Sequence, residues 1–391
     1  MKRFSICCKG SLSWCAIISA ASCWSALLGQ AVAYEAGEHQ DIATKARANY
    51  RSYVAAHPDT AVGGTAIGYA AYWDDEVYVG VVQEDDNPFW MTHFWDPDAA
   101  DDADGLPGCQ NAFQRATFFW NSLLPLYENG AYGGAYRSLG HVMHLVSDMG
   151  TPAHVNLDEH AEGDWYEGTY IPSRRVQSTN IDTASGTLRG LMATAAEIAD
   201  NFDSGPAIGF LGADGEVDLG NRRAGGFTLT PTDEGAEIAA ACYPAAIAGS
   251  GGLLKLFYDT VKPVVSMVAP SEGDICSGIK GVNFTALAHS YNTAYNVVGQ
   301  VHSVAYYDTT VDPYIPGYTP TGSFEFATEC FSPTTAPNGD LQWKATWTCN
   351  INSSKVWVRA VAFDNALCDS LPFTQWIKID SKRPEVINTR P

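Results

Sequence analysis

The first two-thirds of the chain carries apolar residues at the three- and four-residue spacing that is typical of helices. Between Glu38 and about Val54, for example, Ile42, Ala46 and Tyr50 would lie on one helix face. This pattern predicts a helix over that segment. The same spacing predicts further helices over Asn111 to Tyr127, Tyr132 to Met149, Leu188 to Phe202 and Glu234 to about Tyr258.

Two segments between these helices lack the helical period. The stretch Gly63–Trp73 is rich in glycine and aromatic residues and predicts a loop. Residues 74–108 are dominated by Asp, Pro and aromatic side chains, which favours irregular structure. Within the last helix, Pro244 and the glycines from Gly249 to Gly252 predict an interruption.

The pattern changes from helical spacing to alternation near Lys262. From there on, β-branched and aromatic residues alternate or run together between turn residues, which is typical of strands. We predict an immunoglobulin-like β-sandwich over residues 263–391, following an all-α domain over residues 34–262. The clearest predicted strands include Val282–Phe284, Val301–Tyr307, Val356–Phe363 and Phe373–Ile379.

The N-terminus has the pattern of an export signal. Three basic residues fall within the first nine, an apolar run covers Ala16–Leu28, and small residues follow at Ala31–Ala33. This pattern predicts a signal peptide over residues 1–33 and a mature chain that starts at Tyr34. We therefore expect a secreted or periplasmic protein.

Composition adds a strong acidic balance, with a formal net charge of −21. Binding to nucleic acid through charge alone requires clustered Lys and Arg to neutralise phosphates, so the balance argues against that class. Bound divalent cations would reverse the sign locally, which keeps metal-dependent phosphate chemistry open.

Cysteine usage favours an oxidising compartment. After the predicted signal peptide, two cysteines lie in the helical part and four in the β part, and none forms a CxxC pair. Even counts predict one disulfide in the first part and two in the second, with three connectivities open for the latter. The six are Cys109, Cys242, Cys276, Cys330, Cys349 and Cys368.

The stretch from His144 to Asn156 contains the strongest candidate chemistry in the chain. His144 and Asp148 are four residues apart, so on a helix they project from one face. We expect Pro152 to end that helix, and His154 follows within reach of the same place. Imidazole and carboxylate are ligands that zinc prefers.

Further candidate ligands lie on both sides of this stretch. His160 and Asp164 repeat its four-residue spacing, and His39 lies five residues after the predicted mature N-terminus. His93 stands in the aromatic run FWMTHFWDPD, preceded by the acidic residues 84–86. Several zinc ions that share one bridging carboxylate would suit the hydrolysis of a phosphodiester.

These motifs resemble a known family. His144, Asp148, Pro152 and His154 match the pattern His, three residues, Asp, five residues, His, with Pro two before the last His. The run from His93 to Asp98 matches a second motif, HF-aromatic-DPD. Over roughly residues 34–262 the chain resembles the zinc-dependent phospholipase C family, which includes clostridial-type alpha-toxins, and more distantly the single-strand-specific zinc nucleases.

The resemblance implies three zinc ions in the cleft of an all-helical domain, with Asp148 bridging two of them. It implies that an aspartate upstream of His93 is a further ligand, either Asp85 or alternatively Asp86. It also implies that Asp85 and Asp148 are the catalytic residues. The metal ligands implied by the resemblance are Tyr34 (through its amine and carbonyl), His39, Asp85, His93, His144, Asp148, His154, His160 and Asp164.

The resemblance predicts a phospholipase C that hydrolyses phospholipid head groups and makes peripheral contact with membranes. The Tyr34–His39 interval and Asp164 are closer to the nucleases, so a zinc-dependent single-strand nuclease acting on nucleic acid is the alternative enzyme. A non-catalytic surface-binding protein stabilised by metals is a further alternative from a different class. We expect His141, on the His144 face, to be a packing residue or a neighbour of the ligands.

Overall fold

The computed structural model describes the larger part of the chain. The described residues are 36–56, 61–62, 65–66, 73–85, 90–98, 105–157, 178, 180–202, 222–223, 227–228, 231–276, 281–289, 301–309, 324–327, 334–335, 341–347, 353–364 and 373–380. The predicted signal peptide, Tyr34, Asp86, His160 and Asp164 lie outside them.

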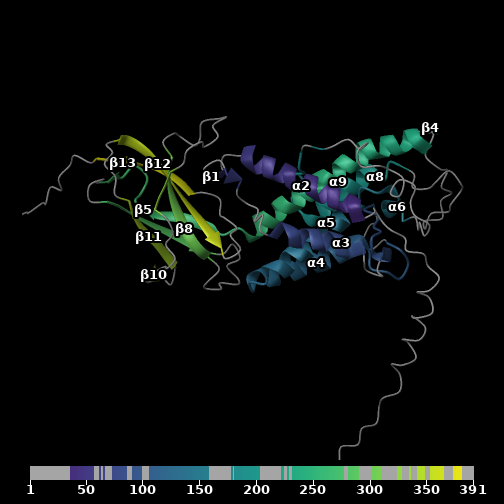
Figure 1. The fold of residues 1–391 in the computed structure, drawn as a ribbon, viewed down its shortest axis with the longest axis horizontal. Coiled ribbons are helices and arrows are strands. Elements are labelled where there is room, and N and C mark those ends of the chain that lie inside the picture. Colours follow the sequence, from purple (N-terminus) through teal and green to yellow (C-terminus); the bar gives the residue numbers. More distant parts are fainter. Residues whose placement is uncertain are drawn as a thin grey trace, which may run out of the picture.

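A helical part is followed by a β part, as the sequence predicts (Figure 1). Short antiparallel pairs also occur, β1 (Ala61–Val62) with β2 (Thr65–Ala66) and β3 (Arg222–Arg223) with β4 (Phe227–Thr228). In the described residues no helix is both long and apolar enough to cross a bilayer. The helices are α2 (Ala36–Ala56), α3 (Asp74–Asp85), the 3-10 turn η3 (Trp90–Thr92), α4 (Ala112–Glu128), α5 (Tyr132–Asp148), α6 (Pro152–Val155), α8 (Leu188–Ala199) and α9 (Pro231–Val261).

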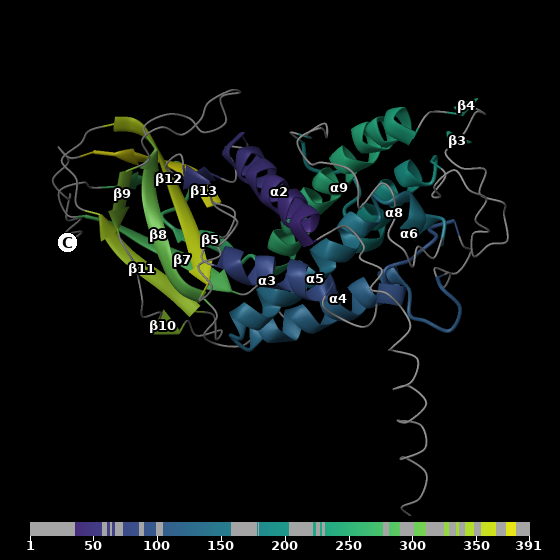
Figure 2. The ribbon, with the colours of Figure 1, turned by 45° about the vertical axis from the view of Figure 1, so that its right-hand side comes forward.

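Helix α5 is the centre of the helical part. It packs against α3, α4, α8 and α9, and every residue from Val142 to Asp148 is buried (Figure 2). A helix that is covered on all sides usually carries apolar residues all round. The exceptions in this stretch are His144, Ser147 and Asp148, so they are polar groups that need partners inside the core.

Helix α3 corrects the prediction of irregular structure after residue 74. Its Val77 and Val81 are buried at four-residue spacing, and Glu84 continues the same inner face. Asp74, Asp75 and Glu76 occupy the first turn, where the positive end of the helix dipole favours acidic residues. The acidic composition of this segment therefore favours a helix start as well as a loop.

Helices α3 and α5 cross in backbone contact at two glycines. A Cβ added to Gly140 would lie 2.2 Å from the Val77 carbonyl oxygen and 2.8 Å from the Gly80 Cα. A Cβ on Gly80 would meet the Arg137 backbone carbonyl in the same way. The absence of side chains here sets the short distance between the two helices, and both carry residues of the site described below.

Helix α9 is continuous, which corrects the predicted interruption at Pro244 and the glycines. Its glycines admit a neighbouring segment instead of ending the helix. A Cβ on Gly251 would lie 2.4 Å from Ile181 Cγ2, and the Asp182 amide donates to the Ala248 carbonyl at 2.8 Å. The glycines therefore serve close packing of residues 181–182 against α9.

The end of α5 also differs from the prediction. The helix ends at Asp148, and Pro152 begins the next helix, α6, at a position where its missing N–H is not needed. Asn111, the first residue of the segment predicted to be helical, caps α4: its Oδ1 accepts from the Gln114 amide at 2.8 Å.

The β part consists of two sheets that share one buried core. The sheet orders are β10-β11-β7-β5 and β6-β13-β12-β8-β9, and the pairs are antiparallel except for the parallel pair β6–β13. The core joins residues of both, including Phe284, Trp343, Val358 and Ile377. The immunoglobulin-like type remains a prediction. The strands are β5 (Val264–Ala269), β6 (Ile275–Cys276), β7 (Val282–His289), β8 (Val301–Thr309), β9 (Phe324–Ala327), β10 (Thr334–Thr335), β11 (Leu341–Trp347), β12 (Ser353–Asp364) and β13 (Phe373–Ile379).

The cysteines of the helical part do not form the predicted disulfide. Cys109 lies in a turn, with its thiol 3.9 Å from Met91 Sδ, whereas Cys242 is buried in the helical core on α9. Both are unbonded thiols, and burial raises the pKa of Cys242. An even count indicates possible pairs, but only the fold brings sulfur atoms together. In the β part, Cys330, Cys349 and Cys368 lie outside the described residues.

A buried hydrogen bond links the helical part to the β part. The Tyr127 hydroxyl of α4 donates to Asp364 Oδ2 at the end of β12, at 2.6 Å. We expect Tyr127→Phe to weaken the docking by about 1–3 kcal/mol, because a buried carboxyl group then has one donor fewer. A double-mutant cycle with Asp364→Ala, followed by chemical denaturation, measures the coupling free energy. Additive effects of the two substitutions would contradict the expectation.

Candidate metal centre

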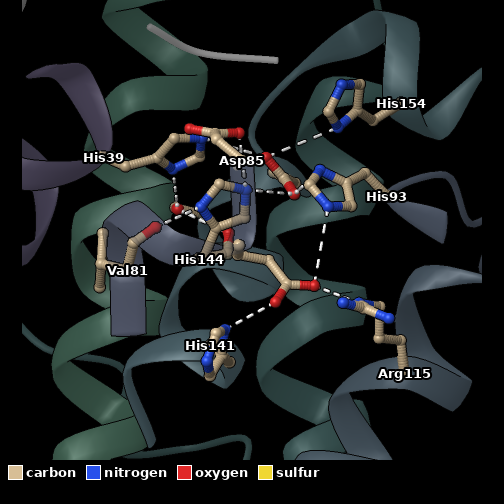
Figure 3. A network of polar contacts seen from close by, with 11 residues as sticks. His39, Val81, Asp85, His93, Arg115, His141, His144 and His154 are labelled. Atoms are coloured by element: carbon tan, nitrogen blue, oxygen red, sulfur yellow. Dashed lines mark hydrogen bonds and ion pairs between the residues drawn. The ribbon is translucent and has the colours of Figure 1, made fainter. Parts of the chain in front are cut away.

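Five segments of the helical part bring six side chains together in one cluster (Figure 3). The segments are α2, the C-terminal end of α3, the residue after η3, α5 and α6. All but Asp85 are fully buried, and Asp85 is partly buried. The six side chains are His39, Asp85, His93, His144, Asp148 and His154.

The two oxygens of Asp148 face different imidazoles. Oδ1 lies 3.4 Å from His39 Nε2 and 3.6 Å from His154 Nδ1. Oδ2 lies 3.3 Å from His93 Nδ1 and 3.4 Å from His144 Nε2. One carboxylate is thus shared between two pairs of ring nitrogens.

These separations fit a metal centre better than direct hydrogen bonds. They exceed the usual donor–acceptor range of about 2.7–3.2 Å. Zinc bonds of about 2.0–2.1 Å in a tetrahedral arrangement place neighbouring ligand atoms about 3.3 Å apart. The distance between His144 Nε2 and Asp85 Oδ1, 3.4 Å, is close to this ligand–ligand separation. Among the described residues, two groups have ligand atoms within 4.8 Å of one another, namely His39 with Asp85 and His144, and His93 with His144 and Asp148.

The tautomer of His144 supports the same interpretation. Its Nδ1 lies 2.8 Å from the Val81 carbonyl oxygen, which only accepts, so Nδ1 carries the proton. Burial, followed by the neighbouring His93, lowers the pKa of His144 to about 3, so the ring is neutral at pH 7. Its Nε2 lone pair therefore points at oxygens of Asp85 and Asp148. Such an arrangement is repulsive unless a cation lies between them.

A hydrogen bond with Ser147 fixes the orientation of His39 in a similar way. The Ser147 hydroxyl donates to the His144 carbonyl oxygen at 2.7 Å, so its oxygen accepts from His39 Nδ1 at 2.8 Å. The other ring nitrogen, Nε2, then faces Asp148 Oδ1 at 3.4 Å. A backbone carbonyl and a hydroxyl thus fix the orientation of two separate imidazoles.

We expect Ser147→Ala to lower zinc affinity about 10–100-fold, because His39 loses the acceptor that fixes its orientation. Competition with a chromogenic chelator measures the affinity. Ser122→Ala is the matched control, since the Ser122 hydroxyl also donates to a backbone carbonyl within its helix but lies on the exposed face of α4. Equal affinities of the two variants would contradict the role of Ser147.

A buried carboxylate beside the site was not among the predicted residues. Burial alone would raise the pKa of Glu84, but hydrogen bonds with His141 and Arg115, together with the nearby His93 ring, outweigh it and lower the pKa. Burial also lowers the pKa of His93. Glu84 was visible in the acidic run 84–86, and its buried position follows once α3 is known to be a helix.

The predicted site residues divide into two sets. The structure brings six of them together, and it places His141 with its Nδ1 2.6 Å from Glu84 Oε2 rather than among the ligand atoms facing Asp148. Tyr34, His160 and Asp164, with the alternative aspartate Asp86, lie outside the described residues. The backbone amine ligand and the third zinc ion therefore remain predictions.

No protein-family model and no curated protein matches the chain. Among solved structures it is similar to alpha-toxin of Clostridium perfringens avian strain SWCP, at 13% identity over 90% of this chain and 100% of that one, with a TM-score of 0.38. Alpha toxin of Clostridium absonum gives 13% identity, 87% and 95% coverage and a TM-score of 0.37. Fibronectin(III)-like modules of CbhA from Clostridium thermocellum give 15% identity and a TM-score of 0.21, over 31% of this chain and 47% of that chain. Similarity at this level assigns neither a fold nor an activity.

Proposed function

We propose that the chain is a zinc-dependent phosphodiester hydrolase. One observation carries the proposal: the buried Asp148 carboxylate faces four imidazole nitrogens at 3.3–3.6 Å, two on each oxygen. A carboxylate whose two oxygens face different imidazoles is suited to bridge two metal ions. Pairs of metal ions about 3.5–4 Å apart are typical of enzymes that cleave phosphate esters.

The residues present fit zinc in donor type and protonation. The site offers imidazole and carboxylate donors, and the Nδ1 partner of His144 leaves its Nε2 as the ligand atom. Zinc ions bound there would polarise the phosphoryl group and make water more acidic at neutral pH. The chain's own residues set the positions: Asp148 holds the two halves of the site together, and Asp85 adds a partly exposed carboxylate at its edge.

Within this class we propose a phospholipase C that acts on phospholipid head groups and is secreted after removal of residues 1–33. The motifs around His93 and His144, which resemble the zinc-dependent phospholipase C family, support this substrate class. The Tyr34–His39 interval favours a second candidate, a zinc-dependent single-strand nuclease. The same proposal includes three zinc ions, with the amine and carbonyl of Tyr34 as ligands.

The test combines metal content with two substrates. We expect the full mature chain to contain zinc by elemental analysis and to release phosphorylated head group from short-chain phosphatidylcholine micelles. A chelator should abolish the activity and zinc should restore it. Turnover of single-stranded DNA but not of phospholipid would select the nuclease. Zinc without turnover of either would indicate the non-catalytic surface-binding protein, and a folded protein without zinc would overturn the proposal.

A further inference from the structure

Glu84 and Asp85 are neighbours in sequence but face different groups. Asp85 Oδ1 lies 3.4 Å from His144 Nε2. Glu84, turned by about 100° on the helix, is fully buried, and its Oε1 lies 3.7 Å from His93 Nε2. In the last turn of α3, the Asp85 carboxylate thus faces the predicted ligand atoms, and the Glu84 carboxylate lies beside His93, away from those atoms.

The Glu84 carboxylate is held in place by two helices. The Arg115 Nε of α4 donates to Oε1, and His141 Nδ1 of α5 lies 2.6 Å from Oε2. The Phe119 ring packs against both partners: His141 stacks on it at 4.4 Å and 9°, and the Arg115 guanidinium lies 5.1 Å from its centroid. Glu84 is therefore a fixed, charge-compensated group rather than a mobile side chain.

His93 lies between two carboxylates. Its Nδ1 is 3.3 Å from Asp148 Oδ2, and its Nε2 is 3.7 Å from Glu84 Oε1. A neutral imidazole carries one proton, so one side of the ring must donate and the other must present a lone pair. The separation of 3.7 Å is longer than a hydrogen bond, and such contacts often shorten when a site is completed.

We propose that Glu84 is a positioning residue, which holds the His93 proton on Nε2 and so presents the Nδ1 lone pair to the metal side of the site. This inference rests on the proposed zinc-dependent function and adds to it a residue that orients one of the proposed ligands. His144 and His39 are oriented by a neutral carbonyl and a neutral hydroxyl. A carboxylate behind His93 also makes the ring a stronger ligand.

The decisive variant removes the carboxylate together with its counter-ion. In Glu84→Met/Arg115→Met two apolar side chains of similar volume replace the buried pair, which is often neutral for stability. We expect about a 10–100-fold loss of zinc affinity by chelator competition. In the metal-free full chain, ¹⁵N spectra of the histidine rings should show His93 protonated on Nε2 in the wild type and as a mixture of tautomers in the variant. The spectrum of His93→Asn assigns the signal.

The matched control removes another Glu–Arg pair that ties α3 to a neighbouring helix. Arg137 Nη2 of α5 donates to Glu76 Oε2 of α3 at 2.7 Å, on the exposed side. Glu76→Met/Arg137→Met should keep the zinc affinity and the His93 spectrum of the wild type. An equal loss in both double variants would mean that any loosening of α3 has this effect, and it would overturn the proposal.

A conservative variant covers the case in which the double variant does not fold. Glu84→Gln keeps an acceptor oxygen and loses only the charge, so the His93 tautomer should persist while zinc affinity falls less, about 3–10-fold. Wild-type affinity in this variant, or an Nδ1-protonated His93 in the wild type, would overturn the proposal. The tautomer is measured without metal or substrate, so its outcome is separate from that of the proposed function.

Discussion

Replacing Asp148 by asparagine is expected to lower zinc affinity by more than about a hundredfold and to abolish hydrolysis. Substitutions behind a metal ligand cost about 10–100-fold, and the loss of a ligand shared between two metals should exceed that. The side chain keeps its size, but one oxygen becomes an amide that cannot face two imidazole nitrogens as an acceptor. Elemental analysis after dialysis, with chelator competition, measures the loss.

Two variants separate the role of Asp148 from a general loss of charge. His154→Ala should lose less zinc, since His154 faces a single Asp148 oxygen at 3.6 Å. Asp259→Asn should lose none, because Asp259 lies on α9 and pairs with Lys255 and Lys262. If Asp148→Asn retained as much zinc as His154→Ala, Asp148 would not be the bridging ligand.

Replacing Gly140 by alanine is expected to destabilise the helical part strongly. The added Cβ would lie 2.2 Å from a backbone oxygen of α3, and backbone cannot move aside without separating the helices. Overpacking typically costs about 1–3 kcal/mol and more where backbone must shift. Because Asp85 is on α3 and His144 on α5, zinc affinity should fall together with the free energy of unfolding.

Gly134→Ala is the control on the same helix. Its Cβ would lie 3.5 Å from Leu126 Cδ1, which is ordinary contact, so the substitution should be neutral or stabilise by up to about 1 kcal/mol. Urea denaturation of the zinc-free proteins measures both. A Gly140→Ala protein as stable as Gly134→Ala would show that the crossing of α3 and α5 tolerates a larger separation.

The central helix and the two polar residues on its inner face could be predicted from the sequence because the signals are local. The four-residue spacing of His144 and Asp148 puts both on one face of any helix, and the apolar residues around them predict burial. His93 and His154 were linked to that face through motif spacing, and the structure brings both to Asp148.

The remaining features depend on contacts between distant segments. Glu84 counts as polar in a periodicity analysis, and it is buried only because Arg115 and His141 arrive from other helices. The glycines of α9 predict an interruption until Ile181 is known to pack on Gly251. Likewise, the number of cysteines does not indicate how far apart they lie in the fold. The expected pairing of Cys109 with Cys242 was therefore wrong.

The contact between His39 and Ser147 joins residues 108 positions apart, and this has a consequence for the order of events during folding. Closing so long a loop costs conformational entropy before any ligand set exists, so the unfolded chain holds no preformed site. Zinc should therefore bind after α2 has docked on α5. Bound zinc should then slow unfolding and leave the folding rate unchanged.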